Sequence, residues 1–204
     1  NTTETQDTEQ LEYVDSRRQR HPATYDLPDI KGPAVYTKEE APESWKWYDA
    51  GKVSDYPRNG GLSMKHGSHE VAVFSLPNQK EESDRWFATQ NMCPAKQVRV
   101  ISRGLIGEPP SGVITIADPV YKTLYDLRTG KGVTSNGETN LSTFQVRTTA
   151  DGRVEVKLPS AEEYAAALDK LTKEAVEASG IKAAKALGKS KPFDANGKHV
   201  ALDW

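Results

Sequence analysis

The chain has 204 residues, of which 36% are hydrophobic and 27% are charged, and its formal net charge is −2 at pH 7. This near-neutral charge gives no basic surface for nucleic acid or for an anionic membrane, so we expect neither as a partner. A single cysteine excludes an internal disulfide, and no apolar run approaches the roughly 20 residues that span a bilayer, so we expect a cytoplasmic protein.

Residues 1–40 are rich in Thr, Glu, Gln, Arg and Pro and show no sustained apolar period. Such a composition does not bury enough apolar surface to form a core, so we predict an extended or disordered N-terminal arm. Val35 and Tyr36 are expected to hold part of this arm against the folded domain. The chain begins with Asn1 rather than Met, and we expect it to be part of a longer polypeptide.

Residues 41–159 contain short apolar stretches separated by turn residues, a pattern typical of an antiparallel β-sandwich or barrel. In the first stretch Trp45 and Trp47, two residues apart, are predicted to share the core-facing side of a strand. A hairpin is predicted at Phe144–Leu158, with Asp151-Gly152 as its tight turn. The other predicted strands are Glu70–Leu76, Trp86–Thr89, Gln97–Ile101, Val113–Ile116 and Thr123–Leu127.

Residues 160–204 change to a helical pattern and are predicted to form a C-terminal helix and tail. Ser160 and Glu163 form a capping box, and a stripe of apolar residues at helical spacing leads to Gly180. This stripe is expected to pack on the sandwich, with docking of another subunit as the alternative. A second short helix is predicted at Ile181–Leu187, and the apolar residues of Lys191–Trp204 would hold the tail in a groove of this chain or of a partner.

Two matched loops are the most informative segments of the chain. The first loop reads Asn91-Met92-Cys93-Pro94-Ala95-Lys96 and is followed by Ser102-Arg103-Gly104-Leu105-Ile106-Gly107. The second loop reads Asp118-Pro119-Val120-Tyr121-Lys122 and is followed by Asp126-Leu127-Arg128-Thr129-Gly130. In this order and spacing the loops resemble those of a Rieske domain, most closely the small subunit or C-terminal Rieske-type module of assimilatory NAD(P)H nitrite reductase. The resemblance covers roughly the stretch from Trp45 to Leu158 and implies a mainly β, Rieske-like antiparallel sandwich over residues 41–159.

The resemblance also indicates where iron ligands would stand. A Rieske [2Fe–2S] centre takes two thiolates and two imidazoles, and an intact site in this family reads Cys-Pro-His-Lys in the first loop and Cys-Pro-Leu-His-Lys in the second. Carried over by position, Cys93 is the one ligand kept, while Ala95 and Tyr121 replace the imidazoles and Asp118 replaces the second thiolate. We therefore expect no cofactor-binding, metal-binding or catalytic residue in this chain. A [2Fe–2S] centre would need ligands outside this pattern.

Two other groups of residues are candidates for chemistry. Cys93 would be a reactive thiol if Lys96, three residues on, lowered its pKa, but a lone cysteine in a β-rich domain is more often a buried small hydrophobe. His66 and His69 could share a metal ion, but no third ligand is near them in the sequence. We expect these two imidazoles to face solvent in a loop.

From the resemblance, we expect the chain to be a non-catalytic accessory module of an NAD(P)H-dependent nitrite reductase in nitrate assimilation. Its partner would be the catalytic part, in cis or in trans, which in this family carries flavin, a [4Fe–4S] cluster and siroheme. The loop tip, with Lys96, Asp118, Tyr121 and Lys122, is the expected docking surface. The alternatives are a Rieske ferredoxin-type electron carrier, with iron on Cys93, Asp118 and Tyr121, and a stand-alone interaction protein that reuses the fold.

Overall fold

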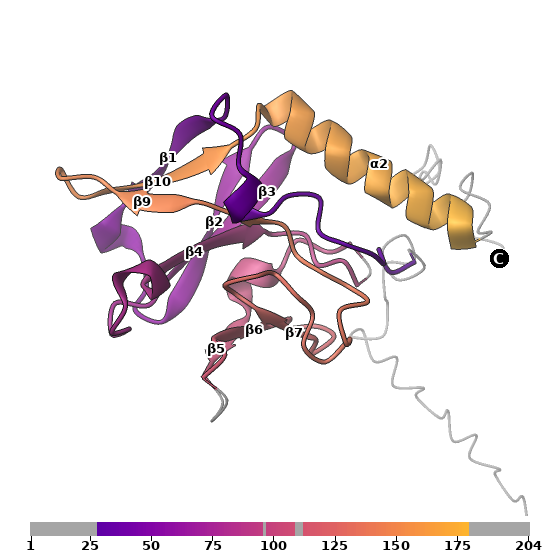
Figure 1. The fold of residues 1–204 in the computed structure, drawn as a ribbon, viewed down its shortest axis with the longest axis horizontal. Coiled ribbons are helices and arrows are strands. Elements are labelled where there is room, and N and C mark those ends of the chain that lie inside the picture. Colours follow the sequence, from indigo (N-terminus) through magenta and orange to yellow (C-terminus); the bar gives the residue numbers. More distant parts are fainter. Residues whose placement is uncertain (1–27, 96, 109–111, 180–204) are drawn as a thin grey trace, which may run out of the picture.

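The computed structural model describes residues 28–95, 97–108 and 112–179, which form three antiparallel sheets and one long helix (Figure 1). The first sheet has the order β1-β10-β9 and comprises β1 (Lys46–Lys52), β9 (Val146–Thr148) and β10 (Arg153–Leu158). The second has the order β2-β3-β4-β8 and comprises β2 (Gly60–His66), β3 (His69–Ser75), β4 (Trp86–Gln90) and β8 (Thr143–Phe144). The third has the order β5-β6-β7 and comprises β5 (Leu105–Gly107), β6 (Thr115–Ala117) and β7 (Leu124–Asp126).

The helix α2 spans Ala161–Ser179, and short 3₁₀ segments lie at η2 (Lys38–Glu40), η3 (Val53–Asp55), η4 (Glu82–Asp84) and η5 (Ile101–Arg103). In Figure 1 the helix lies at the upper right of the view, the first sheet at the left, the second in the centre and the third at the bottom. This arrangement confirms the predicted mainly β fold with a C-terminal helix.

Strand β3 lies at the centre of the domain and is buried on both faces. Val71 and Val73 belong to a first core, which the first two sheets enclose, and Ala72 and Phe74 belong to a second core beneath the third sheet. All four side chains are 0% exposed. A strand covered on both faces requires a continuous apolar run rather than alternation. The predicted strand Glu70–Leu76 corresponds to β3.

The hairpin of β9 and β10 closes the first core. Val154, Val156 and Leu158 alternate along β10 and are fully buried, as the sequence pattern predicts. Burial of such a side chain contributes about 1.5–3 kcal/mol relative to leaving it exposed. Tyr36 packs edge-on against Trp45 beside this core, with ring centroids 5.1 Å apart. Part of the predicted arm therefore lies on the folded body.

Helix α2 packs on the first core. Its start is capped by Ser160 Oγ, which accepts a hydrogen bond from Glu163 N at 3.1 Å. Tyr164 and Leu168 are fully buried in the first core, and Leu171 packs against it. The predicted packing of the helix on the sandwich is therefore confirmed.

Two local predictions are wrong. Gln97–Ile101 forms only an isolated bridge, between Arg99 and Met92, because a turn at Gln97 precedes the bridge and η5 begins at Ile101. Trp47 lies outside the first core, since side chains alternate along β1 and Tyr48 and Ala50 take the core-facing side. Its ring instead lies under the guanidinium of Arg147, with the Arg147 Cζ 4.1 Å from the ring centroid.

The two histidines are not in a solvent-exposed loop, contrary to expectation. His66 ends β2 and His69 begins β3, the two residues pair across the hairpin, and their side chains are only 4% and 7% exposed. His66 Nε2 lies 2.9 Å from the carbonyl oxygen of Pro159, and His69 Nε2 lies 3.3 Å from Asp169 Oδ1. The start of α2, far away in the sequence, covers them, so the local pattern carried no sign of their burial.

The predicted helix Ile181–Leu187, the tail Lys191–Trp204 and residues 1–27 of the arm lie outside the described residues. The domain boundaries placed after residues 40 and 159 stay predictions. Within the described ranges, no helix combines the length and the hydropathy that a membrane span needs.

Candidate functional site

The two loops singled out in the sequence meet at one end of the third sheet. The first loop is closed by hydrogen bonds from Cys93 N to Val98 O, at 2.7 Å, and from Val100 N to Asn91 O, at 3.0 Å. The second loop joins β6 to β7 and is closed by a bond from Lys122 N to the carbonyl oxygen of Asp118, at 3.0 Å. The thiol of Cys93 interacts with the Asp118 carboxylate, so the two loops are in contact.

Asn91 anchors the first loop and was missed by the sequence analysis. This side chain is 1% exposed. Its Oδ1 accepts a hydrogen bond from Ser102 N at 2.8 Å, and its Nδ2 donates to Glu70 Oε2 at 2.6 Å. Asn91 therefore joins the loop to β3 and to η5. The available signal was an asparagine directly after the β4 strand, where a side-chain amide can satisfy backbone groups of a turn.

Cys93 is a buried thiol rather than a reactive one. Its side chain is 0% exposed, and its Sγ lies 3.9 Å from the hydroxyl oxygen of Tyr125. Burial and then the neighbouring Asp118 carboxylate raise the pKa of the thiol well above its usual range. Burial likewise raises the pKa of the Tyr125 hydroxyl. The thiol is therefore protonated at neutral pH, whereas nucleophilic attack needs the thiolate.

Asp118 shapes the second loop from inside. Its side chain is 0% exposed, and Oδ1 accepts hydrogen bonds from Val120 N at 2.6 Å and from Tyr121 N at 3.0 Å. These are the bonds of an Asx turn. Oδ2 is buried without an N–H or O–H donor among the described residues, and the Cys93 thiol interacts with the same carboxylate. Asp118 therefore adds no side-chain surface to a docking face.

The other predicted site positions divide between interior and surface. Ala95 is 8% exposed and belongs to the second core, and Tyr121 is half-buried and packs against that core. Both therefore fill space beside Cys93 with apolar atoms. Lys122 is exposed, with its Nζ donating to the carbonyl oxygen of Pro119 at 2.8 Å. Lys96 lies outside the described residues.

A segment of the N-terminal arm crosses the first loop, which the sequence analysis did not predict. Ile30 is 8% exposed and its N–H donates to the carbonyl oxygen of Pro94 at 2.9 Å. The side-chain amide of Gln97 donates to the carbonyl oxygen of Pro28 at 3.1 Å. Farther along, Gly32 N donates to Glu138 O at 2.8 Å. The first loop is thus covered by residues that precede the β-sandwich in the sequence. An isoleucine within a polar arm was the available signal.

These side chains do not fit a [2Fe–2S] cluster. A Rieske centre needs two thiolates and two imidazoles. The corresponding positions hold one protonated, buried thiol, one methyl group, one phenol, and a carboxylate whose Oδ1 is taken by the loop backbone. Across the described ranges, no three His, Cys, Asp or Glu side chains are grouped so that they could hold a metal ion.

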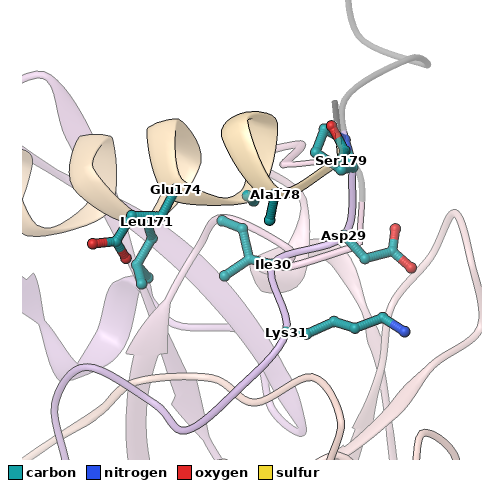
Figure 2. Close-up of a pocket in the computed structure, with 9 residues that line it drawn as sticks. Asp29, Ile30, Lys31, Leu171, Glu174, Ala178 and Ser179 are labelled. Atoms are coloured by element: carbon teal, nitrogen blue, oxygen red, sulfur yellow. The ribbon is translucent and has the colours of Figure 1, made fainter. Parts of the chain in front are cut away.

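A groove of about 550 Å³ lies between the N-terminal segment and the C-terminal half of α2 (Figure 2). Figure 2 shows Ile30 directed towards the helix and Leu171 directed from the helix towards the segment, whereas Lys31 extends away. The lining residues are Pro28, Asp29, Ile30, Lys31, Leu171, Glu174, Ala175, Ala178 and Ser179. This set contains neither Cys nor His, so the loops remain the candidate site.

Comparisons with known proteins agree with this fold. Residues 46–157 match the family model of the Rieske-like [2Fe-2S] domain. The chain is 30% identical to nitrite reductase [NAD(P)H] of Emericella nidulans over 145 residues, which cover 64% of this chain and 13% of that protein. It is 33% identical to the nitrite reductase (NADH) small subunit of Escherichia coli strain K12 over 85 residues, which cover 42% of this chain and 74% of that subunit.

Comparison with solved structures supports the same fold. A crystal structure described as an NADH-dependent nitrite reductase small subunit from Mycobacterium tuberculosis superposes with a TM-score of 0.51 at 21% identity. The superposition covers 58% of this chain and 99% of that one, and at this identity it shows the fold alone. With the family match over more than half of the chain, these findings show that the chain belongs to the Rieske-like [2Fe-2S] domain family and resembles the small subunits of nitrite reductase.

Proposed function

We propose that this chain is the accessory module of an NAD(P)H-dependent nitrite reductase of nitrate assimilation, that it holds no [2Fe–2S] cluster, and that it acts by docking on the catalytic part. That part, in the same polypeptide or in a separate cytoplasmic subunit, would carry the flavin, [4Fe–4S] cluster and siroheme that the resemblance implies. The similarity to the fungal enzyme and to the bacterial small subunit supports this assignment. Because the chain spans only 13% of the fungal protein, catalysis is assigned to the partner.

The closed interior at the former ligand positions is the observation that carries the proposal. Cys93 and Asp118 are 0% exposed and Ala95 is 8% exposed. The thiol is held protonated by burial and by the carboxylate beside it. Ile30 and the rest of the N-terminal segment cover the first loop. A cluster would have to displace these packed groups, and an electron that moved between such a cluster and a partner would have to pass through them.

A docking role is supported by how the loops keep their shape. Asn91 and Asp118 each form two side-chain hydrogen bonds. Those of Asn91 tie the first loop to β3 and η5, and those of Asp118 hold the backbone of the second loop. Apolar packing of Ala95 adds to these bonds. Together they offset the binding energy that a cluster would contribute to folding. A surface with a fixed shape binds a partner with a smaller loss of conformational freedom.

The test compares complete nitrite reductase with the same enzyme lacking residues 46–157. Without the module we expect less assembled enzyme and lower NAD(P)H-dependent nitrite turnover. Nitrite reduction from an artificial donor such as reduced methyl viologen should fall only by the fraction of enzyme that fails to assemble. Unchanged assembly and turnover would contradict the proposal. Full assembly with a loss confined to NAD(P)H-driven electron transfer would favour the electron-carrier alternative.

A further inference from the structure

The third sheet carries a row of apolar side chains on its outer face. Leu105 pairs with Ala117, Ala117 pairs with Leu124, and Val133 N donates to the carbonyl oxygen of Leu124 at 2.7 Å. Residues paired across neighbouring strands project to the same face of a sheet. Leu105, Ala117, Leu124 and Val133 therefore form one line across the sheet, here called the outer row.

The residues next to the outer row along the three strands point into the second core, so the outer row itself faces solvent. Ile106 pairs with Ile116, Ile116 pairs with Tyr125, and all three contribute to the second core. Side chains alternate between faces along each strand. Leu105 is accordingly 79% exposed and Val133 is 49% exposed.

This concentration of exposed apolar side chains is specific to one end of the domain. Among the described residues, the exposed large hydrophobic side chains are Val53, Leu62, Leu105, Val120 and Val133. Leu105 and Val133 belong to the outer row, and Val120, 44% exposed, lies in the loop that joins β6 to β7 beside it. Single exposed apolar residues are ordinary, whereas a contiguous group marks a surface that binds another molecule.

Two cations flank the outer row. The Arg103 side chain is exposed two residues before Leu105 and forms no hydrogen bond or ion pair with another described residue, and Lys122 is exposed in the β6–β7 loop. Of the nearby carboxylates, Glu108 is exposed and accepts a hydrogen bond from Gln79 Nε2 at 3.2 Å. Asp118 is 0% exposed, and Asp126 accepts bonds from Arg128 N at 2.8 Å and Thr129 Oγ1 at 2.9 Å.

We propose that the outer row docks on an apolar patch flanked by carboxylates on the catalytic part of nitrite reductase. This inference rests on the proposed function and names the surface through which that function is exerted. The apolar residues supply the buried contact, and Arg103 and Lys122 pair with the partner's carboxylates and set the orientation.

A second copy of this chain fits the outer row less well. A two-fold contact through this face would place the Arg103 and Lys122 cations of one copy near those of the other, which is repulsive. Strands lie about 4.8 Å apart, so a row across three strands and the bridged segment at Val133 is only about 15 Å wide. Such a face is smaller than the roughly 800 Å² per partner of a standard interface, so the outer row is one part of the contact with the catalytic polypeptide.

The experiment measures binding of the whole chain to the catalytic polypeptide of nitrite reductase from the same source, expressed without this module. The test variant carries Leu105→Glu and Val133→Glu, and the matched control carries Leu62→Glu, which replaces a 38% exposed leucine on β2. Burial of one such side chain corresponds to about a 10- to 100-fold change in the dissociation constant, so the loss of two should weaken binding by at least this factor. We expect the test variant to lose this factor and the control to bind within about twofold of the native chain. Arg103→Gln with Lys122→Gln should abolish the salt dependence of binding.

Circular dichroism melting verifies that each variant is folded. Equal binding of the native chain, the test variant and the control would overturn the inference and leave the proposed function standing. No binding of the native chain to the catalytic polypeptide would overturn the proposed function as well. A native dimer in light scattering that Leu105→Glu dissociates, with binding to the catalytic polypeptide unchanged, would assign the outer row to a second copy instead.

Discussion

Replacing Asp118 with alanine should destabilise the domain, because this side chain holds the second loop together. Its Oδ1 accepts hydrogen bonds from Val120 N at 2.6 Å and from Tyr121 N at 3.0 Å. Bonds to a charged acceptor contribute about 1.5–3 kcal/mol each, so their loss costs about 3–6 kcal/mol. The change also removes the buried Oδ2, which lacks an N–H or O–H donor among the described residues and whose burial costs about 1–3 kcal/mol. With the midpoint of each range, the free energy of unfolding should fall by about 2–3 kcal/mol.

The assay is thermal and urea unfolding at pH 7, followed by circular dichroism. For a domain of this size the expected loss lowers Tm by about 4–12 °C. Asp118→Asn is the matched control, because its amide oxygen can accept the same two backbone bonds, and it should cost less than about 1 kcal/mol. An Asp118→Ala variant as stable as the native protein would refute the conclusion that this former ligand position has become a structural one.

Four further predictions concern the interior. Cys93 should resist a thiol reagent at pH 8 in the folded protein and react fully in urea, and rapid reaction of the folded protein would contradict its burial. Because folding raises the pKa of this thiol above the unfolded value of about 8.5, its contribution to stability is present below pH 8.5 and is lost as pH rises further. Urea titrations at pH 7 and 10 should show the loss, and Cys93→Ala should reduce it, with the remainder due to the buried tyrosines such as Tyr125 and Tyr164, whose pKa values folding also raises. Gly61→Ala should destabilise by about 1–3 kcal/mol, since its Cβ would come within 2.6 Å of the Phe74 ring, and native-like urea midpoints would refute this. Leu168→Ala should cost about 2–5 kcal/mol by calorimetry, against less than about 0.5 kcal/mol for the exposed Leu105→Ala.

Local patterns were sufficient for the elements whose residues carry their own signal. The alternation of Val154, Val156 and Leu158 predicted the β9–β10 hairpin, and Ser160 with its helical stripe predicted α2. The order of the two loops predicted the fold because their motifs occur together at a fixed separation. In each case the residues that form the element also contain the pattern that predicts it.

Features that depend on distant segments escaped the sequence analysis. Strand β2 lies at an edge of its sheet and is largely solvent-exposed, so its alternation was weak. His66 and His69 are buried because Tyr48 of β1, Pro159 and α2, all distant in the sequence, cover them. The cover over the first loop comes from Ile30, more than sixty positions before Pro94. No local pattern encodes these long-range contacts.

The site positions show the same limit. The sequence indicated that Asp118 stands where a thiolate would be, but its interior position depends on how β6 and β7 place the loop. The outer row was likewise invisible, because Leu105, Ala117, Leu124 and Val133 become neighbours only through strand register. The expected docking surface therefore included Asp118, which is buried, and did not include the outer row beside it.

The measurement that tests the central claim most directly is the visible absorption spectrum and the iron and sulfide content of the chain purified without oxygen. A Rieske ferredoxin with all four ligands, purified in parallel, serves as the positive control. The closed, protonated interior around Cys93 predicts a colourless, folded protein with iron at background level. A brown protein with two irons and two sulfides per chain would contradict the account and establish the electron-carrier alternative in its place.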